Sequence, residues 1–395
     1  MSTHDADPVD IAIVGAGAVG LAAALALSRE GRSVALLGPV ATPRDGRTVA
    51  LLDGSWRLLS ELGIREAMLE KAAPLSVMRL VDDSGSLFRQ PPVEFRASEI
   101  GLEAFGWNIE NADLTAILAE KAGTIPGLRM IPAFVRSIAP ETDGIRLSGD
   151  GFNTVKARLV VGADGRNSQV RAVAAIESRE WRYPQVALTA IFGHRRDHRE
   201  ASTEFHTRKG PCTLVPLPGR RSSLVWLLDP DEAESVAALD DAAFALRVER
   251  QVQSLLGAMT VQGPRGKVPM GGLSVTHFGA GRMALIGEAA HVFPPIGAQG
   301  LNLGLRDVAA LREALEGVRD SGGDAVIAEY DAARQADVRL RTGAVDMLNR
   351  TLLTDLLPAD LLRGAGLLAL SEIAPLRRFV MRQGLAGGSA RQDQA

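Results

Sequence analysis

The glycine spacing Gly15-x-Gly17-x-x-Gly20 constrains the fold of this chain more than any other feature of its sequence. It follows the apolar run 11–14, typical of a buried parallel strand, and precedes residues 21–29, which are rich in the helix formers Ala and Leu. In such a strand–turn–helix unit the first glycine permits the turn, the second lets a pyrophosphate approach the backbone, and the third lets the helix pack on the strand. The pattern therefore predicts a dinucleotide site at a helix N-terminus.

The acidic residue that normally ends the second strand of this unit is missing. Residues 33–37 form the predicted strand, and Gly38 follows where a carboxylate would usually bind ribose hydroxyls. Either another group binds the ribose, or the adenosine end is held loosely. Arg44 and Arg47 lie nearby in the sequence and are candidates for the pyrophosphate, with a solvated basic loop as the alternative.

A second candidate motif begins where the apolar run 159–161 ends. Asp164 follows this predicted strand, so its carboxylate is placed to accept hydrogen bonds from ribose or ribityl hydroxyls. Gly165 allows a close backbone turn, and Arg166 and Arg171 are candidates to face a phosphate. An ordinary Asp-Gly turn is the alternative.

The third motif, residues 287–304, is the most specific of the three. Gly287 ends a predicted strand, and Glu288 is placed to bind a polyol chain such as ribityl. Two prolines then stiffen the loop, and small residues allow a flat ring to approach the backbone. The helix that starts near Gln299 aims N–H groups at that ring, and its N-terminus would stabilise the negative charge of a reduced flavin.

Two polar residues of this motif receive different predictions. Asn302 is a candidate to hydrogen-bond the pyrimidine edge of a flavin, whereas His291 is expected to be a structural hydrogen-bonding histidine rather than a base. His194, His198 and His206 are scattered without ligand spacing, so no metal site is predicted.

Composition narrows the class of protein. The chain of 395 residues is 46% hydrophobic and 23% charged, as expected of a folded globular protein. Its formal net charge of -3 gives no electrostatic reason to expect nucleic-acid binding. Its one cysteine, Cys212, is expected to be an ordinary strand residue.

The N-terminus does not resemble a secretory signal, and no apolar run approaches the roughly 18 residues of a membrane span, so a cytoplasmic location is expected.

The order of the predicted elements indicates a discontinuous cofactor domain with a second domain inserted into it. Short alternating runs between residues 183 and 229 are typical of an antiparallel sheet, and a helix is predicted over 231–256. The predicted fold class is α/β with inserted α+β: a Rossmann-like domain, a mostly antiparallel sheet domain and C-terminal helices. The expected cofactor domain covers 1–74, 103–176 and 272–340; the sheet domain, which would bind substrate, covers 75–102 and 177–271; and a helical segment covers 341–395.

The three motifs, in this order, resemble those of the FAD-dependent aromatic hydroxylases related to para-hydroxybenzoate hydroxylase. The resemblance extends from residue 10 to about 311. Within that family, 295–307, 107–111 and 381–385 are most similar to the ubiquinone-biosynthesis hydroxylases. Glu288, Pro294 and Ala298 depart from the family's usual residues, and Glu288 preserves the carboxylate.

The resemblance implies FAD as cofactor, NADH or NADPH as electron donor, O2 as co-substrate, and ring hydroxylation through a flavin C4a-hydroperoxide. It implies no catalytic base, because the flavin carries the chemistry. The FAD-binding residues that it and the motifs together predict are Gly15, Gly17, Ala18, Val19, Gly20, Arg44, Arg47, Asn111, Val135, Asp164, Gly165, Arg166, Gly287, Glu288, Pro295, Gly297, Gln299, Gly300, Leu301 and Asn302.

The expected substrate is a small aromatic molecule, with a polyprenyl phenol of ubiquinone biosynthesis as the leading hypothesis. Three alternatives stay open: a hydroxylase of a small soluble phenol or polyketide, a flavin-dependent reductase of isoprenoid double bonds, and a non-catalytic flavoprotein subunit of a biosynthetic complex. Leucines and arginines of the segment 351–387 either pack onto the cofactor domain or contact a partner protein or the inner membrane peripherally.

Overall fold

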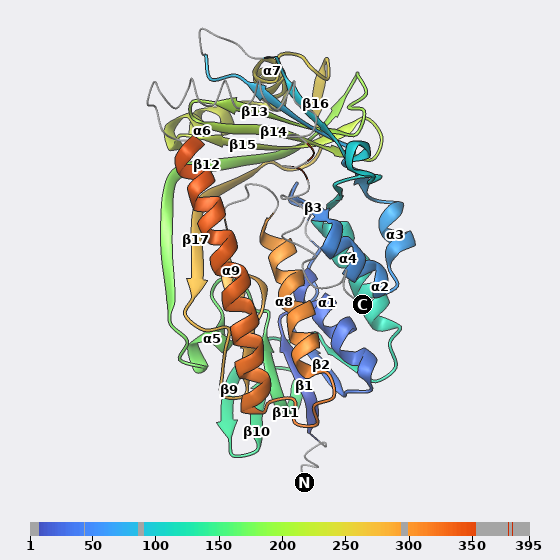
Figure 1. The fold of residues 1–395 in the computed structure, drawn as a ribbon, viewed down its shortest axis with the longest axis vertical. Coiled ribbons are helices and arrows are strands. Elements are labelled where there is room, and N and C mark those ends of the chain that lie inside the picture. Colours follow the sequence, from blue (N-terminus) through green and yellow to red (C-terminus); the bar gives the residue numbers. More distant parts are fainter. Residues whose placement is uncertain are drawn as a thin grey trace.

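Two sheets, one above the other, organise the molecule (Figure 1). The structure, a computed structural model, describes residues 8–42, 44–85, 91–293 and 299–352, together with Arg378 and Met381. Within those residues no helix is long and apolar enough to cross a bilayer. Residues 294–298 and most residues after 352 are not described. For residues 339–352 the structure describes the helix but not the side chains.

The lower sheet has the parallel core of a Rossmann-type domain. Its strands follow the order β18 (Gly279–Ala280), β19 (Met283–Leu285), β11 (Phe152–Gly162), β1 (Val9–Val14), β2 (Val34–Leu37) and β8 (Leu128–Ile131). All neighbours in this order are parallel except β18 and β19, and the hairpin β9 (Val135–Glu141) and β10 (Gly144–Gly149) extends β11. The carboxyl ends of β1, β11 and β19 therefore meet at one edge, where such sheets bind ligands.

Helices cover this sheet and bury its apolar strands. Helix α1 (Ala18–Leu27) is buried along nearly its whole length and packs against α8 (Gln299–Leu315) and α4 (Asn111–Gly123). The long α9 (Asp324–Leu352) packs on α8 and runs beside it in Figure 1. The short α5 (Gln169–Val173) follows β11.

Among the described residues, the upper sheet has nine strands. They are β20 (His291–Val292), β17 (Gly266–Val275), β12 (Ser178–His194), β15 (Arg221–Leu228), β14 (Gly210–Leu217), β13 (Ala201–Thr207), β5 (Val77–Asp82) and β6 (Val93–Arg96), with β16 (Met259–Val261) beside β12. All pairs are antiparallel except β13 with β5. Strands β12 and β17 are long enough to reach down to the lower domain (Figure 1).

A small ribbon and two short helices connect the two parts. The ribbon pairs β7 (Gly106–Glu110) with β3 (Thr48–Leu52) and β4 (Ala73–Pro74). Helices α2 (Asp53–Glu61) and α3 (Arg65–Leu69) follow β3. Trp56 of α2 stacks on Trp107 of β7, with ring centroids 4.2 Å apart. At the opposite face of the ribbon, the Thr48 hydroxyl donates to the Ser223 hydroxyl of β15 at 2.9 Å, so hydrogen bonding joins the ribbon to the upper sheet.

The predicted α/β class with an inserted, mostly antiparallel sheet is confirmed. One local prediction was wrong. The helix expected over 231–256 is two helices, α6 (Pro230–Ala237) and α7 (Asp241–Gln251), because the Asp240 side chain accepts a hydrogen bond from the Ala243 N–H at 2.8 Å and starts a new helix.

Candidate functional site

The first motif has the geometry that its spacing predicted. A Cβ added at Gly15, whose φ is +110°, would lie 2.2 Å from the Ala163 carbonyl oxygen, and one added at Gly20 would lie 1.9 Å from the Gly15 carbonyl oxygen. Both positions therefore require glycine, the first for β1 to turn beside β11 and the second for α1 to pack against that turn. A Cβ at Gly17 would meet nothing within 4 Å, so this glycine leaves open space rather than filling a contact.

The third motif meets the first at Val19. A Cβ at Gly287, whose φ is +60°, would lie 3.3 Å from the Val19 side chain. A Cβ at Gly304 of α8 would lie 2.7 Å from that side chain and 3.2 Å from the Gly287 Cα. Segments separated by more than 250 residues are thus in direct contact, and Ala163 brings the second motif to the same point. We call this meeting of the three motifs the glycine junction, defined by Gly15, Gly20, Ala163, Gly287 and Gly304.

The groups exposed at the glycine junction fit FAD. No side chain caps α1, and its first turn contains no acidic residue, so the N–H groups of Ala18 and Val19 are available to phosphate oxygens. Glu288 follows Gly287 in a short 3-10 turn (Gly287–Ala289), between two buried neighbours, yet its own side chain is exposed. It makes no hydrogen bond or ion pair with the described residues, so its carboxylate is free to accept polyol hydroxyls.

Asp164 and its neighbours have local partners. The Asp164 carboxylate accepts hydrogen bonds from the Ser168 hydroxyl at 2.6 Å and from the N–H groups of Gln169 and Val170 at 2.7 and 3.2 Å. It thereby holds the start of α5. Arg171, expected to face a phosphate, instead donates to the carbonyl oxygens of Ala289 and Arg166 at 2.8 Å each. This arginine joins the second motif to the third.

The predicted arginines of the first and second motifs are paired with acids. Arg166 lies 3.1 Å from the Glu180 carboxylate of β12. Arg44 lies 2.8 Å from Asp113 and 3.4 Å from Glu110, and Arg47 lies 2.8 Å from Asp45. Arg44 and Arg47 keep more than half of their side-chain surface exposed, so both can exchange these partners for a phosphate.

The backbone around Arg47 also connects to α4. The Asn111 N–H donates to the Arg47 carbonyl oxygen at 3.0 Å, which joins the arginine loop to the start of that helix. Val135 is buried at the start of β9 and packs in the core of the lower domain. Gly165 has a φ of +79° and open space at its Cβ position, as the predicted close turn requires.

Gly38 is a geometric requirement rather than a simple loss of an acid. Its φ is +138°, its N–H donates to the Ile131 carbonyl oxygen at 2.9 Å, and a Cβ there would lie 3.1 Å from the Ala16 nitrogen. An acidic side chain at this position would therefore strain the backbone and crowd the first motif.

Asn302 has a structural use that its sequence position did not reveal. Its side-chain oxygen accepts the Leu52 N–H at 3.0 Å, and its side-chain nitrogen donates to the Ala50 carbonyl oxygen at 2.8 Å. Both groups of the amide thus tie α8 to β3, and the contact of Asn302 with a flavin stays a prediction. The neighbouring Gly300 has open space at its Cβ position, and Leu301 packs on the core. Pro295 and Gly297 lie outside the described residues, as does the side chain of Gln299.

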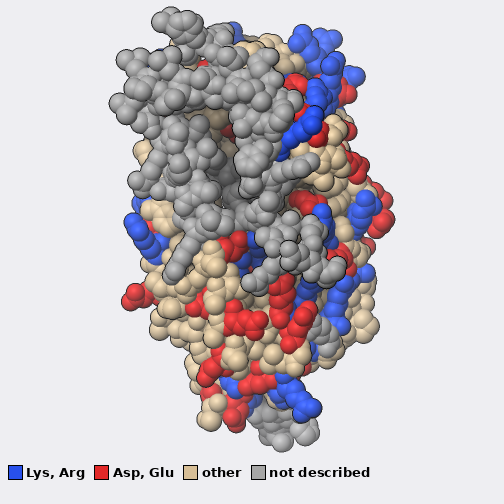
Figure 2. All heavy atoms as spheres, in the orientation of Figure 1, with Lys and Arg blue, Asp and Glu red and all other residues tan. Residues whose placement is uncertain are grey.

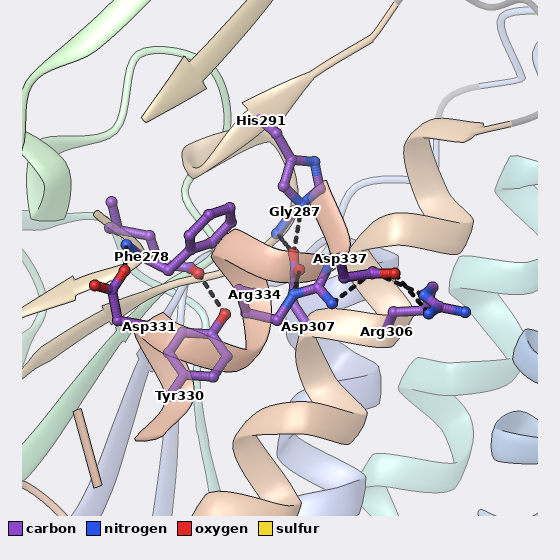
Figure 3. Close-up of polar contacts among 10 residues, drawn as sticks. Phe278, Gly287, His291, Arg306, Asp307, Tyr330, Asp331, Arg334 and Asp337 are labelled. Carbon is purple, nitrogen blue, oxygen red and sulfur yellow. Dashed lines mark hydrogen bonds and ion pairs between the residues drawn. The ribbon is translucent and has the colours of Figure 1, made fainter. Parts of the chain in front are cut away.

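Beneath the glycine junction lies a buried charged network that the sequence did not predict (Figure 3). The Asp307 carboxylate accepts hydrogen bonds from the Gly287 N–H at 2.8 Å and from Arg334 Nε at 2.6 Å, and it lies 2.7 Å from His291 Nε2. The side chains of Asp307 and His291 are fully buried, and Arg334 is 3% exposed. His291 therefore has the hydrogen-bonding role expected of it. A charged residue on the apolar side of α8 was the available sequence signal.

The network continues to the surface through Asp337. Arg334 donates to this carboxylate at 2.7 Å, and Arg306 binds it through two nitrogens at 2.7 and 3.0 Å. Burial would raise the pKa of Asp337, but the two arginines outweigh burial and hold that pKa well below its ordinary value. Burial likewise opposes the charge on Arg334, yet Asp307 and Asp337 raise the pKa of its guanidinium. Asp337 and Arg334 therefore both stay charged inside the protein.

Other candidate side chains lie away from the glycine junction. Cys212 is fully buried in β14, and burial raises the pKa of its thiol, which fits the predicted role of an ordinary strand residue. His206 is half-buried and lies 3.0 Å from Glu204 on the same strand. No group of three or more metal-ligating side chains occurs in the part of the chain that the structure describes.

The parallel sheet and the glycine junction define a flavoprotein class with a Rossmann-type cofactor domain. Residues 8–342 match the model of the FAD binding domain family. The chain is 34% identical to ubiquinone hydroxylase UbiL of Rhodospirillum rubrum, over 97% of this chain and 91% of that protein. It is 29% identical to 3-demethoxyubiquinol 3-hydroxylase of Escherichia coli, over 96% of this chain and 98% of that protein.

Solved structures show the same fold. The p-nitrophenol 4-monooxygenase PnpA of Pseudomonas putida is 19% identical and superposes with a TM-score of 0.80, over 97% of this chain and 99% of that one. HpxO of Klebsiella pneumoniae, in complex with FAD and uric acid, is 18% identical with a TM-score of 0.77, over 98% and 99% of the two chains. This chain belongs to the family of FAD-dependent monooxygenases that includes the ubiquinone-biosynthesis hydroxylases, and it is an enzyme with FAD as cofactor.

Proposed function

We propose that this enzyme hydroxylates the aromatic ring of a polyprenyl phenol in ubiquinone biosynthesis, with NADH or NADPH as electron donor and O2 as co-substrate. The observation that carries the proposal is the glycine junction combined with 34% identity to a ubiquinone hydroxylase over nearly the whole chain. Bound FAD supplies the redox chemistry, including the activation of O2. The protein contributes binding, orientation and exclusion of water.

Particular residues are assigned to the parts of FAD. Gly17, Ala18 and Val19 would hold the pyrophosphate through backbone groups, with Arg44 and Arg47 as mobile counter-charges. Glu288 would accept hydrogen bonds from the ribityl or ribose hydroxyls. Because Asp164 already holds α5, we assign it to the support of this site and give Glu288 the more direct role.

The aromatic substrate would bind between the two sheets. The inner face of the upper sheet carries Ser223, whose hydroxyl is bonded to Thr48 and lies 3.4 Å from the Asn108 side-chain nitrogen. The outer face is already covered by α6 and α7, which pack on Leu188, Phe192 and Trp226. Only the inner face is therefore directed toward the cofactor domain, where a ring can meet FAD.

A hydroxylase of a small soluble phenol is the second candidate. The fold shared with p-nitrophenol 4-monooxygenase favours this class, although low identity restricts that likeness to the fold. The intact glycines of the first motif argue against a non-catalytic subunit, since Gly17 has no packing role to explain it. For a polyprenyl substrate, we also propose a cytoplasmic enzyme whose C-terminal segment contacts the inner membrane or a biosynthetic partner.

Quinone profiling of a deletion strain tests the proposal. We expect loss of ubiquinone and accumulation of a prenylated precursor that lacks one ring hydroxyl, with restoration by the wild-type gene. Complementation with Glu288→Gln should be weaker than complementation with Glu66→Gln, a matched change of an exposed glutamate of α3 outside the cofactor site. A normal quinone profile in the deletion strain would exclude the polyprenyl substrate and favour the soluble phenol.

A further inference from the structure

A hollow of about 410 Å³ opens on the upper domain, away from the cofactor site. Five arginines line it: Arg79, Arg195, Arg196, Arg199 and Arg220. We call it the arginine hollow. Its place is the end of the upper sheet near β16, and Figure 2 shows Lys and Arg side chains gathered at the upper right of the molecule, over that end.

The positive charges around the arginine hollow are only partly balanced by acids, through Glu94 and through Asp197, which attracts Arg199 and Arg220. Arg79 lies 2.8 Å from Glu94, and Arg196 donates to the Ser254 carbonyl oxygen. Arg195, Arg199 and Arg220 form no ion pair with the described residues. Asp197 is the one acid in the lining. A bound anion would relieve the repulsion among these guanidinium groups.

The backbone that carries these arginines is fixed in place. His198 Nδ1 accepts the Glu200 N–H at 3.0 Å, so its Nε2 carries the proton and donates to the Leu217 carbonyl oxygen at 3.0 Å. This histidine ties the loop of Arg195 and Arg199 to the turn of Arg220. The N–H groups of Arg195 and Arg196 donate to the carbonyl oxygens of Ala258 and Leu256. The arginines thus emerge from three segments, the strand β5, the loop after β12 and the turn before β15, as expected of a preorganised site.

The floor of the arginine hollow is apolar. Ala201, Leu214 and Leu256 are buried there, and Leu255 lies beside them. Leu214 and Leu256 belong to the cluster under α7, on the face of the sheet opposite to Ser223. The hollow is therefore separated from the cofactor site by the sheet. A rim of guanidinium groups above an apolar floor fits an anion that carries an apolar group.

We propose that the arginine hollow is a second ligand site that binds a phosphate group, through Arg195, Arg199 and Arg220, with an apolar portion of the same ligand on the leucine floor. Guanidinium groups bind phosphate oxygens through paired, charge-assisted hydrogen bonds. Two sources share this chemistry: a soluble phosphorylated metabolite and the headgroup of an anionic phospholipid. The site acts separately from the ring hydroxylation.

The test uses the full-length, FAD-loaded enzyme and two probes. Inorganic pyrophosphate represents the soluble source and is titrated calorimetrically. Phosphatidylcholine vesicles, with and without about one third phosphatidylglycerol, represent the lipid source and are assayed by co-sedimentation. The triple variant Arg195→Gln/Arg199→Gln/Arg220→Gln should lose about tenfold or more in affinity for the effective probe, because each charge-assisted bond is worth well above RT. Its flavin spectrum should be unchanged.

The matched control is Arg65→Gln/Arg129→Gln/Arg136→Gln, which removes the same charge from exposed positions of the lower domain. It should bind the effective probe like the wild type. Pyrophosphate binding alone would identify a soluble ligand, and binding to the anionic vesicles alone would identify a lipid headgroup. The proposal is overturned if neither probe binds the wild type, if the first triple variant binds as well as the wild type, or if both variants lose affinity equally.

Discussion

The carboxylate of Asp307 accepts the backbone N–H of Gly287 at 2.8 Å, inside a fully buried pocket. Gly287 immediately precedes Glu288 and contacts Val19 at the start of α1. Through this one hydrogen bond, a charge on α8 fixes the turn that presents Glu288 to the cofactor. Arg334 and His291 complete the partners of the carboxylate, so the network supports the site from below (Figure 3).

Asp307→Asn should destabilise the protein and weaken FAD binding together. The substitution removes one of the two carboxylates that bind the buried Arg334 guanidinium and leaves it with Asp337, and breaking a buried ion pair costs about 3 to 5 kcal/mol. Urea unfolding and a fluorescence titration of the apoprotein with FAD measure the two effects. Asp320→Asn, which removes a half-exposed partner of Arg282, should cost about 1 kcal/mol or less. Equal stability of the two variants would contradict a supporting role for Asp307.

Gly17→Ala and Gly20→Ala should separate cofactor binding from folding. A methyl group at position 17 meets no protein atom, so the apoprotein should keep its stability while the FAD dissociation constant rises by about tenfold, or about 1.4 kcal/mol. A methyl group at position 20 would collide with the Gly15 carbonyl and should cost about 1 to 3 kcal/mol of unfolding free energy. If Gly17→Ala bound FAD normally, the pyrophosphate would have to lie elsewhere.

Asp337 should make stability depend on pH in the acid range. Its pKa is lower in the folded than in the unfolded protein, so its contribution is complete above the ordinary carboxyl value of about 4 and is lost as pH falls toward the lowered pKa. The difference in unfolding free energy between wild type and Asp337→Asn should therefore be constant from neutral pH to about pH 5 and shrink below about pH 4. A difference that grows on acidification would contradict the assignment.

Cys212 should resist alkylation in the folded protein. Its side chain is fully buried under α7, and burial raises the pKa of the thiol, so neither access nor thiolate is available at neutral pH. Incubation with iodoacetamide, followed by mass measurement, should show no label on the native enzyme and complete label in urea. Rapid labelling without denaturant would show that the upper domain opens in the native state.

The sequence predicted features that depend on neighbouring residues. The glycine spacing of the first motif sufficed to predict its turn, because Gly20 is restricted by the Gly15 carbonyl oxygen, five residues earlier in the same strand–turn–helix unit. The structural partners of Asn302 could not be predicted, because Leu52 and Ala50 lie about 250 residues away. The hydrogen bond from Arg171 to the Ala289 carbonyl oxygen could not be predicted for the same reason. A polar side chain near a predicted site can form hydrogen bonds with backbone groups that are distant in the sequence. Only the tertiary structure identifies those groups.

The buried network shows the limit more clearly. Asp307 and Arg334 lie on α8 and α9, and nothing in the spacing of either helix identifies the other as its partner. By contrast, the break between α6 and α7 was predictable from Asp240, an N-cap residue type followed by helix formers. Local capping can be inferred from the chain, whereas the pairing of buried charges requires tertiary structure.

Incorporation of labelled oxygen tests the central claim most directly. The purified, FAD-loaded enzyme is supplied with NADH or NADPH and candidate phenols under an atmosphere of ¹⁸O2. The molecular mass of the product is then measured by mass spectrometry. Ring hydroxylation predicts phenol-stimulated oxidation of the nicotinamide and one ¹⁸O atom in each product molecule. A product formed without label, such as one with a reduced isoprenoid double bond, would contradict hydroxylation and assign the flavin to a reductase.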